Sequence, residues 1–289
     1  MILNNNNLSV LPWYSSLAEQ QAKKSYAYGE IYPLYAPADF FLPFQIIRKT
    51  RTNEITFFNV VNANTNAVIA DYTEYVKDAG LQIVRFENLG YDVVLFPAYM
   101  PMPLNQFDGR YYFVMSDSVE AWYSEVITVV QNVSAYLKIQ WWDVENLVFD
   151  NGQIVYKNPT FKNTLYLNTE LGIPDYEFEE EGEERDGYFF PEKQISEKTY
   201  KFSFLAPEYL CDVMRLIRLS DIVQVTDKYG HLYNVDSFLI EPKWQQQGNL
   251  ANVECEFQTD TVVKKIGRGY INGHADFNGD FNNDFNIIQ

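Results

Sequence analysis

Short apolar runs separated by turn signals fill the stretch between Phe44 and Ala135, and they restrict the fold more than any other feature. Each run is too short for a helix and has the length of a strand. Aromatic residues make up 17% of the 289 residues, which favours pleated sheets over helix bundles. The spacing predicts a β-sandwich or jelly-roll-like domain at residues 45–137. Its expected strands are 44–47, 55–61, 68–72, 81–86, 93–96, 111–115 and 126–130.

A second β-rich domain is predicted at residues 138–266. Asp227 to Gly230 form a turn signal between two strand-like runs, which predicts a hairpin. The last strand alternates apolar and polar residues, and we expect it to close the sheet. The expected strands of this domain are 147–149, 154–156, 165–167, 222–226, 232–241 and 250–257.

One helix is predicted inside the second domain, at about residues 207–218. Pro207 fits the first turn of a helix, where its missing N–H has no intrahelical acceptor. Apolar residues then follow at helical spacing, namely Leu210, Val213, Met214 and Ile217. The predicted fold class is therefore mainly β, with two β-sandwich-like domains, one short α-helix and an extended arm at each terminus.

Residues 1–44 are predicted to form an extended N-terminal arm. A short helix is expected first, because Ser16 and Glu19 have the spacing of a capping box. Prolines then alternate with aromatic residues, which favours an extended strip packed on a neighbouring surface. The alternative interpretation is a strand-rich edge of the next domain. The interface candidates in this segment are Tyr26, Tyr28, Tyr32 and Tyr35.

A repeated Asp-Phe-Asn triplet marks the C-terminal residues, at 276–278, 280–282 and 284–286. An EF-hand calcium loop starting at Asp276 would need a glycine where Phe281 stands and a bidentate acid where Ile287 stands, so that match fails. Four-residue spacing instead places the three rings on one helical face. We therefore predict a C-terminal assembly tail at 267–289 that binds a neighbouring surface through Phe277, Phe281 and Phe285.

The densest charge run of the chain lies at residues 177–186. Gly182 and Gly187 predict that this run is a loop. Charge runs are usually solvated, although a cation site or a substrate cleft would use the same residues. The flanking aromatic residues favour a third interpretation, a docking loop whose rings insert into a neighbour while its acids stay at the rim. These rings are Phe178, Tyr188, Phe189 and Phe190.

The net charge of −17 disfavours a surface that grips a phosphate backbone. Cys211 and Cys255 lie in apolar-patterned stretches, which predicts buried thiols rather than a disulfide. Neither His231, expected at the surface, nor His274 has metal or catalytic spacing to a cysteine. We find no catalytic, cofactor or metal motif, no secretory leader and no apolar run that could span a membrane.

Several segments of the sequence resemble segments of virion structural proteins of tailed phages that infect Bacteroidales, a group that includes the crAss-like phages. These segments are residues 107–113, 121–126, 174–193, 206–211 and 244–250. The Asp-Phe-Asn ending is similar to endings of the same group. No activity-defining motif is among them.

The resemblance implies a non-enzymatic subunit of a cyclic ring in the neck or tail, between portal and tail, that forms part of the conduit for DNA ejection. The expected partners are further copies of this chain and other virion proteins such as portal, neck or tail subunits. No cofactor and no membrane are expected, and DNA would pass only as cargo. The expected location is the virion, after synthesis in the cytoplasm of the host bacterium.

A carbohydrate-binding or glycan-active β-sandwich protein is the alternative hypothesis. Exposed tryptophans stack on sugar rings, and carboxylate pairs hydrolyse glycosidic bonds. The tryptophans are Trp13, Trp122, Trp141, Trp142 and Trp244, and the same residue type also fills β cores. An adhesion domain at the host surface is disfavoured by the missing export signal.

Overall fold

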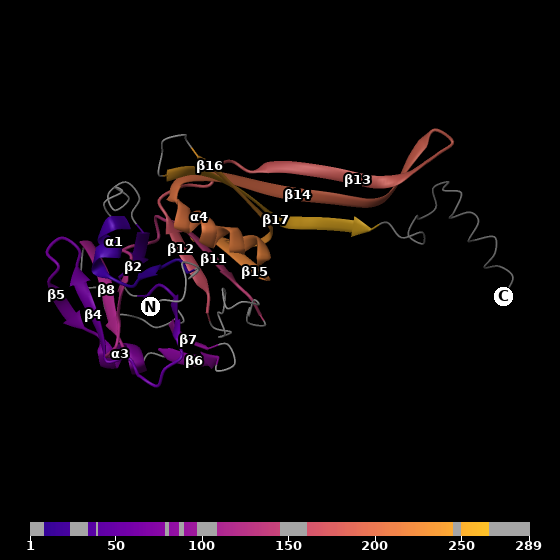
Figure 1. The fold of residues 1–289 in the computed structure, drawn as a ribbon. Coiled ribbons are helices and arrows are strands. Elements are labelled where there is room, and N and C mark those ends of the chain that lie inside the picture. The colour runs from indigo at the N-terminus through magenta and orange to yellow at the C-terminus, as the bar shows by residue number, and fades with distance from the viewer. Residues whose placement is uncertain are drawn as a thin grey trace.

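A computed structural model describes residues 9–23, 34–38, 40–78, 81–86, 90–96, 109–144, 161–244 and 250–265. Strands dominate these residues, and the helices are few and short (Figure 1). The prediction of a mainly β, sandwich-like fold is confirmed. No helix within the described ranges has the length and apolar character needed to cross a bilayer.

The first sheet has seven strands and is built from the N-terminal half of the chain. Its main path runs β1-β9-β8-β10-β2, and β4 extends from β8 and carries β5. β10 and β2 pair in parallel, whereas the other pairs are antiparallel. The strands are β1 (Trp13–Tyr14), β2 (Leu34–Pro37), β4 (Phe57–Asn62), β5 (Val68–Asp71), β8 (Gly109–Ser116), β9 (Ala121–Ser124) and β10 (Ile127–Val130).

A smaller sheet of three strands accompanies the first one, in the order β3-β7-β6. Its strands are β3 (Phe44–Lys49), β6 (Gln82–Phe86) and β7 (Tyr91–Phe96). The short helix α3 (Thr73–Asp78) leads from β5 towards β6. Phe41 lies within ring-contact distance of Phe44, Phe58, Phe96 and Phe113, so aromatic side chains fill the space around both sheets.

The second seven-stranded sheet has the order β12-β11-β15-β16-β17-β14-β13. The predicted hairpin is present as β15 and β16, and the predicted helix is present as α4 followed by the 3-10 helix η3. The run expected to close the sheet lies instead in its interior, as β17 between β16 and β14. The elements are β11 (Leu137–Trp142), β12 (Asn163–Leu167), β13 (Asp175–Arg185), β14 (Tyr188–Pro207), α4 (Glu208–Met214), η3 (Arg215–Leu219), β15 (Ile222–Thr226), β16 (Leu232–Trp244) and β17 (Leu250–Lys265).

The described part of residues 1–44 belongs to the body of the protein. The helix α1 (Leu17–Lys23) begins as expected, since Ser16 Oγ accepts a hydrogen bond from the Glu19 N–H at 3.1 Å. Leu11 and Phe41 are buried in the core, and β1 and β2 are strands of the first sheet. These residues fit the strand-rich edge that we considered as the alternative to an extended arm.

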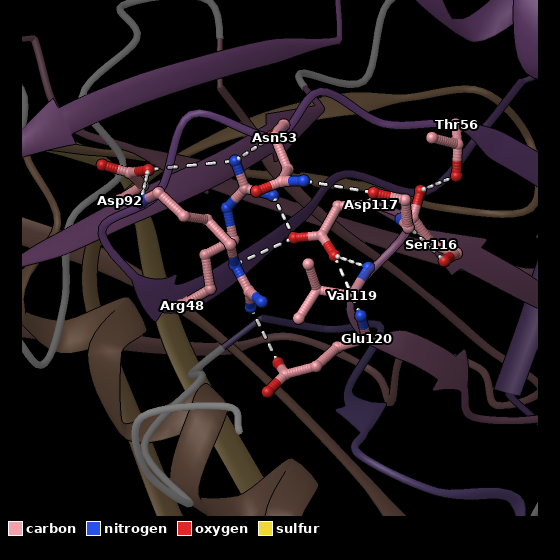
Figure 2. A network of polar contacts seen from close by, with 10 residues as sticks. Arg48, Asn53, Thr56, Asp92, Ser116, Asp117, Val119 and Glu120 are labelled. Atoms are coloured by element: carbon pink, nitrogen blue, oxygen red, sulfur yellow. Dashed lines mark hydrogen bonds and ion pairs between the residues drawn. The ribbon is translucent and has the colours of Figure 1, made fainter.

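A network of buried charges connects the small sheet to the turn between β8 and β9 (Figure 2). Arg48 Nη1 contacts Asp117 Oδ2 at 2.5 Å, and Arg48 Nη2 lies 3.8 Å from Asp92 Oδ2. All three side chains are fully buried. Arg51 adds contacts to Asp117 at 2.9 Å and to Glu120 at 2.8 Å. Burial lowers the pKa of Arg48 and the neighbouring Asp117 counteracts this, so the ion pair keeps a charged arginine inside the protein.

Replacing Asp117 should destabilise the fold strongly. Asp117→Ala leaves the Arg48 guanidinium buried without its nearest counter-charge, which typically costs about 3–5 kcal/mol. Glu120→Ala is the control, because Glu120 is 31% exposed and its ion pair should contribute less than about 1 kcal/mol. Urea denaturation of both variants measures the difference. Equal effects of the two substitutions would contradict this role of Asp117.

Both cysteines are buried and free, as predicted. Burial raises the pKa of Cys211 to about 11, and it also raises the pKa of Cys255. The native thiols should therefore remain unmodified by iodoacetamide at pH 8, whereas unfolding in guanidinium should expose both. Mass spectrometry of the labelled protein checks this, and rapid labelling of the native protein would contradict it.

Candidate interaction arm

The second sheet extends beyond the packed part of the protein, which we call the body, as a long projection. Figure 1 shows β13, β14 and β17 extending together in this projection. We call residues 175–198 and 260–265 the interaction arm. Thr199 and Thr259, where the arm begins, are still buried at 3% and 1% exposure. Among the described side chains of the arm, none is buried. The arm therefore has no hydrophobic core of its own.

The predicted loop at 177–186 is wrong, because these residues form strand β13 paired with β14. Arg185 pairs with Tyr188, which leaves a two-residue turn of Asp186 and Gly187. Both turn residues have positive φ, 51° and 82°, as a type I′ hairpin turn requires. Asp-Gly between strand-like residues is the sequence signal that would have identified this hairpin.

Gly182 is needed at a β-bulge rather than in a loop. Glu181 pairs with Lys193 but Gly182 pairs with Pro191, so Glu192 is an extra residue in β14. A Cβ atom at position 182 would lie 2.1 Å from the carbonyl oxygen of Phe190. Only glycine therefore permits this close approach of the two backbones.

A second bulge occurs where the arm leaves the body. Lys198 pairs with Thr259 but Ser196 pairs with Val262, so β17 has one residue more than β14 in this interval. Asp260 within the bulge has a φ of 56°. Bulges bend and twist a sheet locally, so this one sets the direction in which the arm projects.

Both faces of the arm carry aromatic and acidic residues. Paired residues of neighbouring strands share a face, and successive residues alternate between faces. Tyr176 and Phe178, which are 72% and 62% exposed, share one face with Glu180. The opposite face of β13 carries Glu177, Glu179 and Glu181, and Tyr188 lies on that face because it pairs with Arg185. The arm thus presents exposed rings and carboxylates on both faces.

Polar contacts between strands hold the arm in register. Lys193 Nζ lies 3.1 Å from Glu181 Oε1, and Gln194 Nε2 donates to Glu180 Oε1 at 2.6 Å. At the base, Lys201 Nζ lies 3.2 Å from Asp175 Oδ2, and this hydrogen bond raises the pKa of Lys201. These pairs are solvent-exposed, so each contributes little to stability.

Two edges of the arm are open in the described part of the chain. β13 ends the strand order of its sheet and has a neighbour on one side only. β16 pairs with β17 only as far as Thr259, so residues 260–265 have β14 as their only strand neighbour, and the Thr261 N–H donates to Asp236 Oδ2 at 3.1 Å. Open edges carry backbone groups that can pair with another strand.

The interface candidates from the sequence fall into three groups. The aromatic residues of the acidic run all lie on the arm: Phe178, Tyr188 and Phe189 are exposed and Phe190 is partly exposed. Tyr35 lies in β2 and packs within the chain, with its ring 4.7 Å from that of Tyr136. The other candidates lie outside the described residues, namely Tyr26, Tyr28, Tyr32, Phe277, Phe281 and Phe285.

The described residues offer little for metal or glycan chemistry. Within these ranges, no group of three or more His, Cys, Asp or Glu side chains could hold a metal ion. A hollow of about 410 Å³ on the second sheet includes Glu254 and Glu256, but both form ion pairs with lysines. His231 is at the surface, as predicted, where its ring contacts Asp227 at 2.9 Å.

The tryptophans considered for sugar stacking are mostly core residues. Trp13, Trp122 and Trp141 are at most 4% exposed. Trp142 is partly exposed, with Lys162 Nζ 3.9 Å from its ring centre, and Trp244 is 48% exposed. A binding defect in Trp122→Ala would therefore report a core cavity rather than a lost sugar contact.

Comparisons with known proteins do not assign the chain to a family. No protein-family model matches it, and no curated protein does. Among solved structures, the crystal structure of Dpr2 Ig1-Ig2 in complex with DIP-Theta Ig1-Ig3 contains a similar chain, with 8% identity and a TM-score of 0.17. The similarity covers 82% of this chain and 88% of that one, and at this TM-score it supports no argument.

Gly182→Ala should loosen the arm without unfolding the body. The added methyl group collides with the Phe190 carbonyl, and strain of about 1–3 kcal/mol would speed amide exchange in the arm by about 5- to 150-fold. Gly230→Ala is the control, because a Cβ at position 230 would meet no atom within 4 Å and Gly230 lies in the β15–β16 turn, away from the arm. Hydrogen exchange read by mass spectrometry separates the two. Unchanged exchange at residues 175–198 in Gly182→Ala would contradict the bulge.

Proposed function

We propose that this protein is a non-enzymatic structural subunit of a tailed-phage virion, one copy in a cyclic ring of the neck or tail through which DNA leaves the capsid. The observation that carries this proposal is the interaction arm. A hairpin that projects from a body without burying any described side chain gains its stability from contacts with a partner. An assembly subunit provides such a partner in its neighbours.

The arm has the composition of a protein interface. Aromatic side chains are the typical anchors of interfaces, and here they are concentrated on a surface that lacks a core. Rings of identical subunits use heterologous contacts, in which one surface of each copy meets a different surface of the next. A projecting arm is suited to reach such a second surface.

The acidic character of β13 fits a conduit for DNA. This strand carries seven acids, and the whole chain carries a net charge of −17. Like charges repel, so carboxylates along a channel would keep DNA from adhering as it passes.

The exposed aromatic residues of the arm provide the test. Tyr176→Ser with Phe178→Ser should abolish the closed oligomer and incorporation into virions, while the thermal midpoint stays unchanged because both rings are exposed. The control is Val68→Ser with Ile69→Ser in β5, which alters similarly exposed apolar residues away from the arm. Mass photometry and mass spectrometry of purified particles are the measurements.

The unaltered chain must also satisfy the proposal. It should form a discrete closed oligomer and be present in purified particles. A chain that remains monomeric and is absent from particles would contradict the proposed function, whatever the arm variants do.

A further inference from the structure

We propose that the two open edges of the arm bind each other between copies, so that β13 of one subunit pairs with residues 260–265 of β17 in the next. The arms would then form one continuous sheet with three strands from each copy. This inference rests on the proposed ring and adds the contact that joins its subunits. The partner is a second copy of this chain, because the chain itself carries both halves of the contact.

The charges of the two edges are complementary. β13 is strongly acidic, whereas residues 260–265 of β17 carry two lysines and one acid, Asp260, and lie on the far side of β14. In the register of the sheet, Lys193 of β14 pairs with Glu181 of β13 on one side and with Lys265 of β17 on the other. Gln194 of β14 likewise pairs with Glu180 and with Lys264. In adjacent copies at equal height, acid would therefore meet lysine on both faces of the sheet. The acidic residues of β13 are Asp175, Glu177, Glu179, Glu180, Glu181, Glu183 and Glu184.

The same charges argue against other pairings. Two β13 strands placed edge to edge would oppose acid with acid, and two β17 ends would oppose lysine with lysine. Charged side chains are a common protection of edge strands against unselective pairing. β13 carries seven acids and one arginine, Arg185, and residues 260–265 of β17 carry two lysines and one acid, Asp260, so self-pairing is disfavoured and pairing with the other edge is favoured.

The strand directions fit a ring as well. β13 and β17 both pair antiparallel with β14, so they run in the same direction along the arm. In a cyclic ring every arm points the same way, and β13 would pair in parallel with the neighbouring β17. The contact is heterologous, which is the type that closes rings.

Engineered disulfides test the contact directly. Within one chain Glu179 and Val263 are separated by Ile195, two strand spacings or about 9–10 Å apart, which exceeds the limit of about 7 Å for a disulfide. Glu179→Cys with Val263→Cys can therefore cross-link only different copies. Neighbouring arms could also be shifted along the strand direction by two residues. Glu177→Cys and Glu181→Cys, each combined with Val263→Cys, test these two shifted registers.

At least one of these pairs should give a ladder of dimers, trimers and higher species on a non-reducing gel. The single-cysteine variants should give no ladder, and the buried native cysteines should not contribute. Mass photometry could show a closed oligomer while none of the cysteine pairs gives a ladder. This result would overturn the edge contact but would not contradict the proposed function. A chain that forms no oligomer would overturn both.

Charge reversal provides an independent test. Glu180→Lys with Glu181→Lys makes β13 basic at this level, and Lys264→Glu with Lys265→Glu makes the end of β17 acidic. Each double variant alone should lose the closed oligomer, because equal charges then meet. A mixture of the two should form mixed dimers and higher species, since both kinds of contact between unlike copies again pair opposite charges. A mixture without mixed species in mass photometry, with both variants folded, would overturn the proposal.

Discussion

The ladder between β14 and β17 is the contact on which the architecture of the C-terminal half depends. It extends from Pro207 and Leu250 in the body to Lys193 and Lys265 on the arm. At the body end, Phe202 and Phe257 are buried and α4 packs on the same two strands. At the arm end, none of the described side chains is buried. One continuous pair of strands therefore anchors a surface without a core to a well-packed sheet.

This arrangement separates stability from interaction. The apolar residues of the body and the ion pairs of Arg48 stabilise the fold without any contribution from the arm. The arm is consequently free to carry exposed rings and unpaired edges that would be unfavourable in a core. Its geometry is defined by backbone features, namely the bulge at Gly182, the bulge at Asp260 and the Asp186-Gly187 turn.

The sequence was informative wherever local pattern and tertiary packing agree. The alternation in β17 and the helical stripe from Leu210 to Ile217 led to the correct element types, because both follow burial. The acidic run was misread because its strand buries nothing, so hydrophobic periodicity is absent and the glycines suggested a loop. Strand order was also beyond sequence reasoning, since the interior place of β17 depends on pairings distant in the chain. The aromatic residues of the arm were predicted to lie on a docking loop; the structure places them on a hairpin, where Phe178, Tyr188 and Phe189 are exposed, and their docking stays a prediction.

Cryo-electron microscopy of the assembled oligomer would show the contact between arms directly. We expect a map in which β13 of each copy lies one strand spacing from residues 260–265 of the next, with Glu180 and Glu181 beside Lys264 and Lys265. A closed ring whose arms are separated by solvent, or whose β13 strands face one another, would contradict it.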